Sequence, residues 1–257
     1  PGGLRALALR WLYRQFAAIT YVGVANRDYF QRSGVPARKL FFAPHAVDHA
    51  FFNPEAPAAR TGAAALRSQL GLRASTRVIL FSGKFVDWKQ PLELLRAFQD
   101  SPPADCALVL AGSGPLADTL RSAAQSAPTG AVHFLPFANQ SEMPARYALA
   151  DLFVLPSRGY YETWGLAVNE AMHMGVPCLV SDRVGCQQDL VIEGETGWVF
   201  HHDEPAELTQ ALHRAMHALT RDPDLWRRRA REQAAGYTYA TAAGGLGQAL
   251  DAALKPT

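Results

Sequence analysis

The clearest pattern along the chain is a series of short apolar segments separated by segments of helical length. From residue 77 onward the apolar segments are uniformly hydrophobic, as expected for strands buried on both faces. They lie at Val78–Phe81, Ala107–Ala111, Val132–Leu135, Leu152–Leu155, Cys178–Val180 and Trp198–Phe200. Helices are predicted between them at Pro91–Gln99, Pro115–Ala124, Glu142–Leu149, Trp164–Met174 and Gly185–Val191. This alternation predicts an α/β fold, a doubly wound, Rossmann-like domain with a parallel six-stranded sheet.

The segments on either side of this region are less regular. Before it, the spacing of apolar residues predicts a helix, a strand, a second short helix and a second strand, at Leu4–Ala18, Ile19–Ala25, Arg27–Arg32 and Lys39–Ala43. Residues 53–65 are rich in Pro, Ala and Gly and predict a loop or linker. Residues 204–254 predict two or three closing helices. The resulting division is 1–54, a linker at 55–76, the wound domain at 77–236 and a closing helix at 237–257.

Composition narrows the classes of protein. Hydrophobic residues make up 49% of the 257 positions and charged residues 19%, which suits a large core and excludes a disordered chain. A net charge of +2 gives no indication of nucleic-acid binding. The apolar segments are too short to span a membrane, and Arg5, Arg10 and Arg14 interrupt any signal-peptide layout. Three cysteines cannot all pair, which favours a reducing compartment, so a cytoplasmic location is expected.

The most informative segment is PSRGYYETWGLAVNEAMHMGVP, at 156–177. A helix is predicted to begin near Gly165, with Thr163 as its cap, and to end at Gly175. The backbone N–H groups of Gly165, Leu166 and Ala167 then have no partner within the helix. Together with the helix dipole they form an anion site at the carboxyl edge of the sheet.

Two carboxylates flank this predicted anion site. Glu162 precedes the helix and Glu170 lies about a turn and a half inside it, so both side chains can face one cleft. Carboxylates accept hydrogen bonds from sugar hydroxyls, and the arrangement suits a pyrophosphate between two sugars. Lys84 and Lys89, in SGKFVDWKQ after the first buried strand, lie at the same edge and would neutralise a diphosphate. The alternative is a surface helix with solvated glutamates beside two solvated lysines.

These segments resemble the C-terminal half of retaining GT-B glycosyltransferases of family 4. The resemblance covers roughly residues 40–202, in the order FFAPHAVDHAFF, FSGKFVDWKQPLELLRAF, LVLAGSGP, VHFLPFANQSEMPARYALADLFVLPS, ETWGLAVNEAMHMGVPCLVSD and GETGWVF. It implies the C-terminal domain of a GT-B fold, which binds a nucleoside-diphosphate sugar. The family often has Gly-Gly where this chain has Gly185-Cys186.

The resemblance also implies residue roles. Glu170 is implied as the ribose ligand and Glu162 as the contact to the donor sugar. The Gly165, Leu166 and Ala167 amides are implied to meet the diphosphate. Gly83 belongs to the implied donor-binding loop, in which Lys84 stands where the family usually has arginine and Lys89 where it has lysine. Phe137 matches the loop that receives the base.

The implied reaction is transfer of a sugar, with retention, from a UDP- or GDP-linked donor to an acceptor hydroxyl of a glycan or a lipid-linked sugar. Lys84, Lys89 and the helix N-terminus would stabilise the leaving diphosphate, and the arrangement requires no metal or other cofactor. Because the chain begins at Pro1 and a GT-B enzyme needs two wound domains, residues 1–54 are expected to be the tail of an N-terminal acceptor domain. The chain alone is then expected to bind donor but to be inactive.

Weaker patterns leave alternatives open. Gly112 to Ala117 fits the dinucleotide fingerprint G-x-G-x-x-A, but no acidic residue follows at the spacing a dehydrogenase requires. The pair His45 and His49 and the triplet His201-His202-Asp203 are weak metal patterns. The arginines at 227–229 and 231 predict an exposed helix face, with peripheral contact to anionic lipid at the inner face of the membrane as another interpretation. A non-catalytic module that binds a nucleotide or nucleotide sugar is the rival function.

Overall fold

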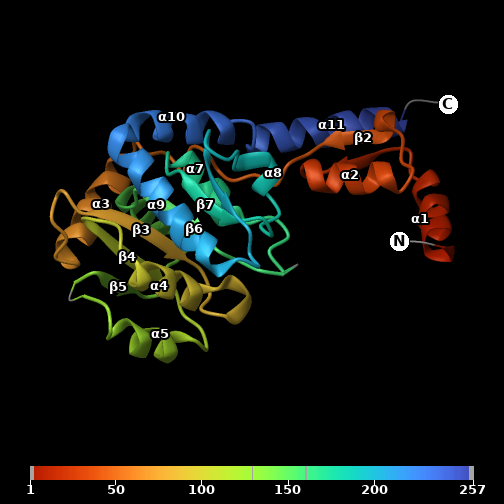
Figure 1. Cartoon of the computed structure of the whole chain (residues 1–257). Coiled ribbons are helices and arrows are strands. Elements are labelled where there is room, and N and C mark those ends of the chain that lie inside the picture. Colours follow the sequence, from red (N-terminus) through yellow and green to blue (C-terminus); the bar gives the residue numbers. More distant parts are fainter. Residues whose placement is uncertain (1–2, 129, 160, 255–257) are drawn as a thin grey trace. The chain divides into compact units, whose positions relative to one another are not determined.

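The structure of the chain is a computed structural model that describes residues 3–128, 130–159 and 161–254. It divides into two compact units (Figure 1). The larger unit comprises residues 49–235, and the smaller one combines residues 1–48 with 236–257. The unit boundaries therefore differ from the predicted division, because residues 49–76 belong to the larger unit.

The larger unit contains a six-stranded sheet in which all paired strands are parallel. The strands are β3 (Arg77–Ser82), β4 (Cys106–Ala111), β5 (Val132–Leu135), β6 (Leu152–Leu155), β7 (Cys178–Ser181) and β8 (Gly197–Phe200). Their order in the sheet is β5-β4-β3-β6-β7-β8 (Figure 1). This is the order of a doubly wound fold, which confirms the predicted fold class.

Helices connect these strands close to the predicted positions. They are α4 (Pro91–Asp100), α5 (Ala117–Ala124), α6 (Met143–Leu149), α7 (Leu166–His173), α8 (Gln187–Leu190), α9 (Pro205–Arg221) and α10 (Pro223–Ala234). Two 3₁₀ turns, Asp87–Lys89 and Gln140–Glu142, lie in the loops after β3 and β5. The central strand β3 is buried from Val78 to Phe81 and pairs with β4 over its whole length. Burial on both faces explains why its sequence shows no alternation.

The predicted loop at 53–65 is wrong. Residues Pro57–Gln69 form helix α3, which belongs to the larger unit and packs against α6. Proline is favoured at the first position of a helix, and alanine has the highest helix propensity. Gly62 is the point of contact, because a Cβ there would press against the Cβ of Ala145. The predicted linker at 55–76 is therefore largely a helix of the domain itself.

The smaller unit consists of α1 (Leu4–Arg14), β1 (Ile19–Tyr21), α2 (Val24–Arg32), the 3₁₀ turn Ala37–Lys39, β2 (Leu40–Phe42) and α11 (Tyr239–Leu254). Strands β1 and β2 pair in parallel, and α11 packs on them with Gly245 against the Phe42 carbonyl. Helix α2 begins at Val24, so the predicted strand at Ile19–Ala25 is shorter than expected. Residues 255–257 of the predicted closing helix lie outside the described residues.

No helix in the described part of the chain is both long enough and apolar enough to cross a membrane. The smaller unit nevertheless exposes large apolar side chains on its helices. Leu4, Leu7 and Trp11 on α1 are between 63% and 86% exposed. Leu246, Leu250 and Leu254 on α11 are between 56% and 72% exposed.

Candidate functional site

The candidate site lies where the winding of the sheet reverses. Strands β3 and β6 are neighbours at the centre of the sheet, and the connections that follow them continue to opposite sides. The loop after β3 spans residues 83–90 and the loop after β6 spans residues 156–165. Ligands of doubly wound sheets bind at this point, beyond the carboxyl ends of the strands. The topology therefore brings together two of the loops that the sequence singled out.

The two loops are packed directly against each other. The Arg158 amide donates a 2.8 Å hydrogen bond to the Trp88 carbonyl, and the Arg158 guanidinium forms a 2.9 Å ion pair with Asp87. The Trp88 and Tyr161 rings also contact each other, with centroids 5.6 Å apart. These contacts fix the spacing between residues of the β3 loop and residues of the β6 loop.

Lys89 and Glu162 form the ion pair at the centre of the site. The Lys89 ammonium lies 2.5 Å from a Glu162 carboxylate oxygen, and only 20% and 14% of the respective side chains are exposed. The same oxygen accepts a 3.1 Å hydrogen bond from the Ser157 hydroxyl. An ion pair that is largely shielded from water interacts more strongly than an exposed one. Lys89 and Glu162, predicted as site residues from separate segments, are thus in direct contact.

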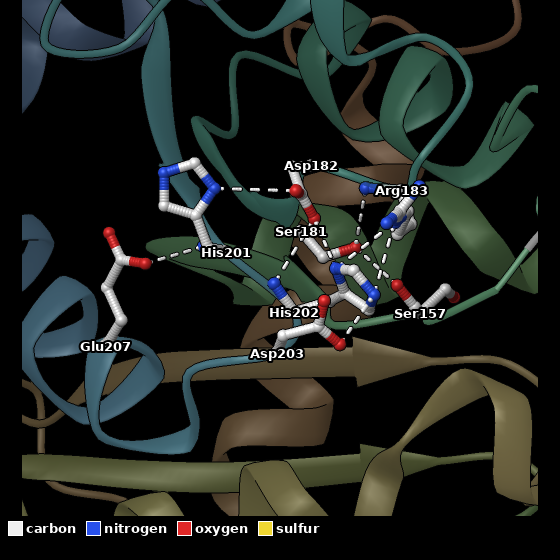
Figure 2. Close-up of polar contacts among 8 residues, drawn as sticks. All are labelled: Ser157, Ser181, Asp182, Arg183, His201, His202, Asp203 and Glu207. Carbon is white, nitrogen blue, oxygen red and sulfur yellow. Dashed lines mark hydrogen bonds and ion pairs between the residues drawn. The ribbon is translucent and has the colours of Figure 1, made fainter.

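Ser157 is in turn held by a residue at the end of a neighbouring strand. It is fully buried, and its carbonyl accepts a hydrogen bond from the buried Ser181 hydroxyl at the end of β7. Figure 2 shows these two serines together, beside the polar cluster that follows β7 and β8. The Arg183 amide in turn donates to the Ser181 hydroxyl at 3.2 Å. A continuous series of contacts therefore runs from the end of β7 to the Glu162 carboxylate.

Gly83 and Lys84 occupy the same loop as Lys89. The Gly83 amide donates to the Ala111 carbonyl at the end of β4, which continues the β3–β4 pairing. The position of a Gly83 Cβ lies 3.3 Å from the Lys89 side chain, so the glycine leaves space for it. Lys84 is exposed, and no ion pair joins it to another described residue. The structure thus links Lys89, but not Lys84, to Glu162.

Helix α7 begins directly after the Glu162 loop. Its N-cap is Gly165, with a φ of 98°, and no side chain caps it. The prediction that Thr163 would be the cap is therefore wrong, because a left-handed glycine makes the turn into the helix. Leu166 is 46% exposed and Ala167 is partly exposed, so the first amides of the helix lie near the surface. These amides have no acceptor within the helix, so they are available to donate to an anion.

Glu170 projects from α7 toward α6. Its carboxylate accepts a 2.7 Å hydrogen bond from the hydroxyl of Tyr147, a fully buried residue. Burial raises the pKa of Glu170 above its usual value, and the Tyr147 hydrogen bond opposes this shift only in part. Burial and the adjacent carboxylate also raise the pKa of Tyr147. Glu170 is thus a partly buried acceptor with a fixed orientation.

We expect Glu170→Gln to stabilise the domain above neutral pH. The pKa of Glu170 is higher in the folded state than in the unfolded state. The protonated carboxyl therefore stabilises the fold fully below the unfolded pKa, and this stability is lost as the pH rises through the folded pKa. Glutamine stays neutral and can still accept from Tyr147. The melting temperature should rise at pH 8 and should be unchanged at pH 4, where the carboxyl is largely protonated in both states. Calorimetry at both pH values measures the melting temperatures, with the exposed Glu232→Gln as the control. Equal changes in melting temperature in the two variants would contradict the prediction.

The loop after β7 supports the segment between Glu162 and α7. The Gly185 amide donates to the Glu162 carbonyl at 3.0 Å, and the Cys186 amide donates to the Trp164 carbonyl at 2.8 Å. Cys186 is buried, and its sulfur lies 3.6 Å from the position that a Gly165 Cβ would take. Gly185 and Cys186, which stand where the resembling family often has Gly-Gly, therefore hold the Glu162 backbone.

Phe137 lies in the loop after β5, two strands away from β3 in the sheet. Its ring is 67% exposed at the same carboxyl edge as the Lys89 loop. The preceding residue is fixed, since the buried Arg146 donates a 2.6 Å hydrogen bond to the Pro136 carbonyl. Burial lowers the pKa of Arg146. Among the described residues, no hydrogen bond or ion pair joins Phe137 to Lys89 or Glu162.

The glycines of the G-x-G-x-x-A sequence have a packing role. Gly112 has a φ of 149°, and a Cβ there would overlap the Gly83 carbonyl oxygen. A Cβ on Gly114 would press against the backbone of Phe85. These glycines allow the loops after β3 and β4 to lie backbone against backbone. Close packing of neighbouring loops accounts for the pattern without a dinucleotide.

The triplet His201-His202-Asp203 forms a polar cluster after β8 (Figure 2). One His202 ring nitrogen lies 2.9 Å from Asp182 and the other 2.9 Å from Asp203. Burial alone would raise the pKa of Asp182, but hydrogen bonds from the His202 amide and the two histidine rings outweigh it and lower that pKa. Across the described ranges, no group of three or more His, Cys, Asp or Glu side chains could hold a metal ion. The cluster joins the loops after β7 and β8.

Sequence reasoning missed two residues of the site. Ser157 supports the Glu162 carboxylate, and Tyr147 orients the Glu170 carboxylate. Ser157 directly follows the proline that ends a buried strand, which marks it as a residue at the carboxyl edge. Tyr147 gives no such signal, because its hydroxyl reaches Glu170 only through the packing of α6 against α7.

The chain thus has a doubly wound parallel sheet of the Rossmann type, with an ammonium, a carboxylate and the first amides of α7 near its reversal point. Residues 63–233 match the model of the family described as glycosyl transferases group 1. Because this match covers more than half of the chain, the chain belongs to that family. Family membership agrees with the resemblance that the sequence motifs indicate.

The curated proteins to which this chain is similar are named as glycosyltransferases. The chain is 34% identical over 204 residues to a D-inositol 3-phosphate glycosyltransferase from Nocardia farcinica, covering 74% of this chain and 44% of the relative. It is 31% identical over 215 residues to a GDP-mannose-dependent alpha-(1-6)-phosphatidylinositol monomannoside mannosyltransferase from Mycolicibacterium smegmatis, covering 80% and 54%. The chain therefore spans about half the length of the curated relatives it matches.

Solved structures share the fold. Anabaena HepE in complex with UDP superposes with a TM-score of 0.78 at 21% identity, covering 96% of this chain and 68% of that one. Sucrose-phosphate synthase from Thermosynechococcus elongatus has a TM-score of 0.71 at 25% identity, covering 96% and 61%. The fold thus agrees with glycosyltransferases of the GT-B type.

Proposed function

We propose that this chain carries the donor site of a glycosyltransferase that transfers a sugar from a nucleoside diphosphate to an acceptor hydroxyl. The observation that carries the proposal is the contact between Lys89 and Glu162, beside the first amides of α7 at the reversal point of the sheet. A cation, a carboxylate and a helix N-terminus within adjoining loops suit a ligand with both a phosphate and a sugar. Relatives that act as glycosyltransferases support the same reaction.

The proposed residue roles follow from these positions. The amides of Gly165, Leu166 and Ala167 bind the diphosphate, and Lys89 stabilises the charge that develops on it as the sugar leaves. Glu162 accepts a hydroxyl of the donor sugar, and Glu170, held by Tyr147, accepts a ribose hydroxyl. We propose that Lys84 contributes positive charge, that Gly83 leaves space in the loop, and that the Phe137 ring stacks on the base.

The finer features of the reaction are part of the proposal. Family 4 membership and transfer with retention are supported by the order of the motifs along residues 40–202. A UDP- or GDP-linked donor is supported by relatives and structural neighbours whose names include these nucleotides. The proposed acceptor is a glycan or a lipid-linked sugar, and the name of the phosphatidylinositol monomannoside mannosyltransferase supports the lipid-linked class. We place the reaction in the cytoplasm, at the inner membrane face.

The smaller unit is proposed to form part of a second, acceptor-binding domain. Its described residues form a sheet of two strands, and α1 and α11 expose large apolar side chains. A two-stranded sheet is too small to bury these faces by itself. We propose that sequence outside this chain completes the domain and contributes the acceptor site.

Titration calorimetry of the 257-residue chain with UDP, GDP and their sugar conjugates tests donor binding. We expect heat of binding for one nucleotide class and its loss in Lys89→Met. No heat with any of these ligands would contradict the donor site. A turnover assay on the same preparation should show no transfer. A full-length protein that binds donor and transfers no sugar to any acceptor would favour the non-catalytic binding module.

A further inference from the structure

A charged cavity lies at the opposite edge of the sheet from the proposed donor site. It has a volume of about 510 Å³, within the range of ligand pockets. Ala150 and Val176, which line it, each stand two residues before the start of β6 or β7. The cavity therefore opens at the amino ends of these strands, whereas Lys89 and Glu162 lie beyond the carboxyl ends of β3 and β6. Its other walls come from α3 and the residues just before it, from the end of α6, from the turn after α7 and from α10.

Four arginines line this cavity: Arg60 of α3 and Arg227, Arg228 and Arg231 of α10. The only acidic lining residues among those described are Glu55 and Asp224, so the lining carries four positive and two negative charges, a net +2. The arginines at 227, 228 and 231 face the cavity because positions three and four residues apart share one side of a helix. Three of the four arginines in the sequence RRRAR, at 227–231, therefore line this cavity.

Neighbouring groups hold the guanidiniums in place. Arg60 pairs with Glu55, and Arg231 lies 3.9 Å from the same carboxylate. Arg227 lies 3.3 Å from Asp151, and Arg228 reaches its nearest carboxylate, Glu232, only at 4.0 Å. Each guanidinium has five N–H donors, and one carboxylate cannot occupy them all. The acidic residues therefore orient the arginines and leave donors for a further anion.

The backbone around Gly175 brings α10 close to the cavity floor. The position of a Gly175 Cβ lies 3.5 Å from both the Arg227 carbonyl oxygen and the Arg231 side chain. The stem of Arg231 therefore packs on the turn that ends α7. The first turns of α3 and α10, whose dipoles are positive at that end, also contribute Arg60 and Asp224 to the lining.

We propose that this cavity binds a phosphate ester dianion of the size of a glycerol phosphate, held by Arg60, Arg228 and Arg231. Arginine matches the oxygens of a phosphate through pairs of parallel hydrogen bonds. The net charge of the lining equals that of the dianion with opposite sign, and the volume leaves space for the alcohol that the phosphate carries. The ester can be a free metabolite or the headgroup of a lipid.

The test uses the 257-residue chain and sn-glycerol 3-phosphate, with binding followed by titration calorimetry. We expect saturable binding that Arg228→Glu and Arg231→Glu each weaken by at least about 10-fold. Arg229→Glu is the matched control: it makes the same charge change on the same helix, but Arg229 contacts the Glu195 carbonyl and the Trp226 ring instead of the cavity. Its affinity should stay within about 2-fold of the unmodified chain. Circular dichroism verifies that each variant is folded.

Two further experiments distinguish a lipid headgroup from a free ester, and this cavity from the donor site. The chain is sedimented with vesicles of phosphatidylcholine that contain or lack phosphatidic acid. Cosedimentation that requires both phosphatidic acid and Arg228 assigns the site to a lipid headgroup. Binding of glycerol phosphate without cosedimentation assigns it to a free ester. Lys89→Met should bind glycerol phosphate as the unmodified chain does. The proposal is overturned if neither probe binds, if Arg229→Glu weakens binding as much as Arg228→Glu, or if Lys89→Met abolishes it.

Discussion

Replacement of Lys89 by alanine is expected to lower sugar transfer by the full-length protein by about 10²–10³-fold. This is the usual effect of removing one preorganised donor that stabilises charge in a transition state. Lys89 is suited to this role because its side chain is only 20% exposed and its ammonium is fixed by Glu162 at 2.5 Å. Both kcat and the KM for the donor should change, because Lys89 binds the diphosphate of the donor and also stabilises the charge that grows on it as the bond to the sugar breaks.

The matched control is Arg96→Ala on α4. Arg96 is 61% exposed and lies 3.7 Å from Glu93 one turn away, so its removal deletes one positive charge without touching the loops of the site. We expect its kcat and KM to remain within about 2-fold of the unmodified protein, because exposed ion pairs contribute little. Equal turnover in Lys89→Ala and Arg96→Ala would remove Lys89 from the site.

Replacement of Gly112 by alanine is expected to destabilise the larger unit by about 3 kcal/mol or more. The added Cβ would overlap the Gly83 carbonyl and approach the Phe85 ring at 3.2 Å, and the φ of 149° is disfavoured for any residue with a side chain. Overpacking and backbone strain each cost about 1–3 kcal/mol. Urea unfolding should show a lower midpoint with an unchanged slope. Donor binding should fall as well, because the displaced Gly83 belongs to the loop that carries Lys89.

Gly71→Ala separates strain from overlap. Gly71 has a φ of 64°, and nothing lies within 4 Å of the position of its Cβ. This variant therefore has the cost of a left-handed alanine alone, about 1 kcal/mol. If Gly112→Ala is no more destabilising than Gly71→Ala, the loops after β3 and β4 do not need their close contact.

The strands of the larger unit could be predicted because each has a distinctive composition. A parallel strand buried on both faces must be apolar at every position, and Val78–Phe81 and Leu152–Leu155 are completely buried in the structure. The order of the strands placed the loops after β3 and β6 side by side, which is why Lys89 and Glu162 meet. Here a rule for doubly wound sheets was sufficient to bring together residues that are 73 positions apart.

Helix α3 was missed because its composition supports two interpretations. Proline and glycine in PAARTGAAALRSQ indicate a loop, whereas alanine and a first-position proline favour a helix. The deciding contribution is tertiary: α3 packs closely on α6, with Gly62 against Ala145. Most of the stability of a helix this short comes from such packing, which the sequence of the segment alone does not contain.

The hydrogen bonds that orient the carboxylates were also beyond the sequence. Tyr147 lies on α6 as one more buried aromatic residue, and its hydroxyl matters only because Glu170 of α7 is 2.7 Å away. Ser157 and Ser181 belong to segments that precede and follow α7, and they meet because β6 and β7 are neighbours. Such contacts depend on distances of a few tenths of an ångström. Residue spacing predicts which loops meet, but it does not predict which atoms bond.

The position of β3 at the centre of the sheet has a consequence for how the protein is made. Its neighbour β4 follows within about 25 residues, but its other neighbour, β6, begins only at Leu152. While the ribosome synthesises the residues between, one side of the apolar segment Val78–Phe81 has its backbone groups unpaired. An open, hydrophobic strand edge promotes association between nascent chains. Chains terminated before Leu152 should therefore depend on chaperones to stay dispersed.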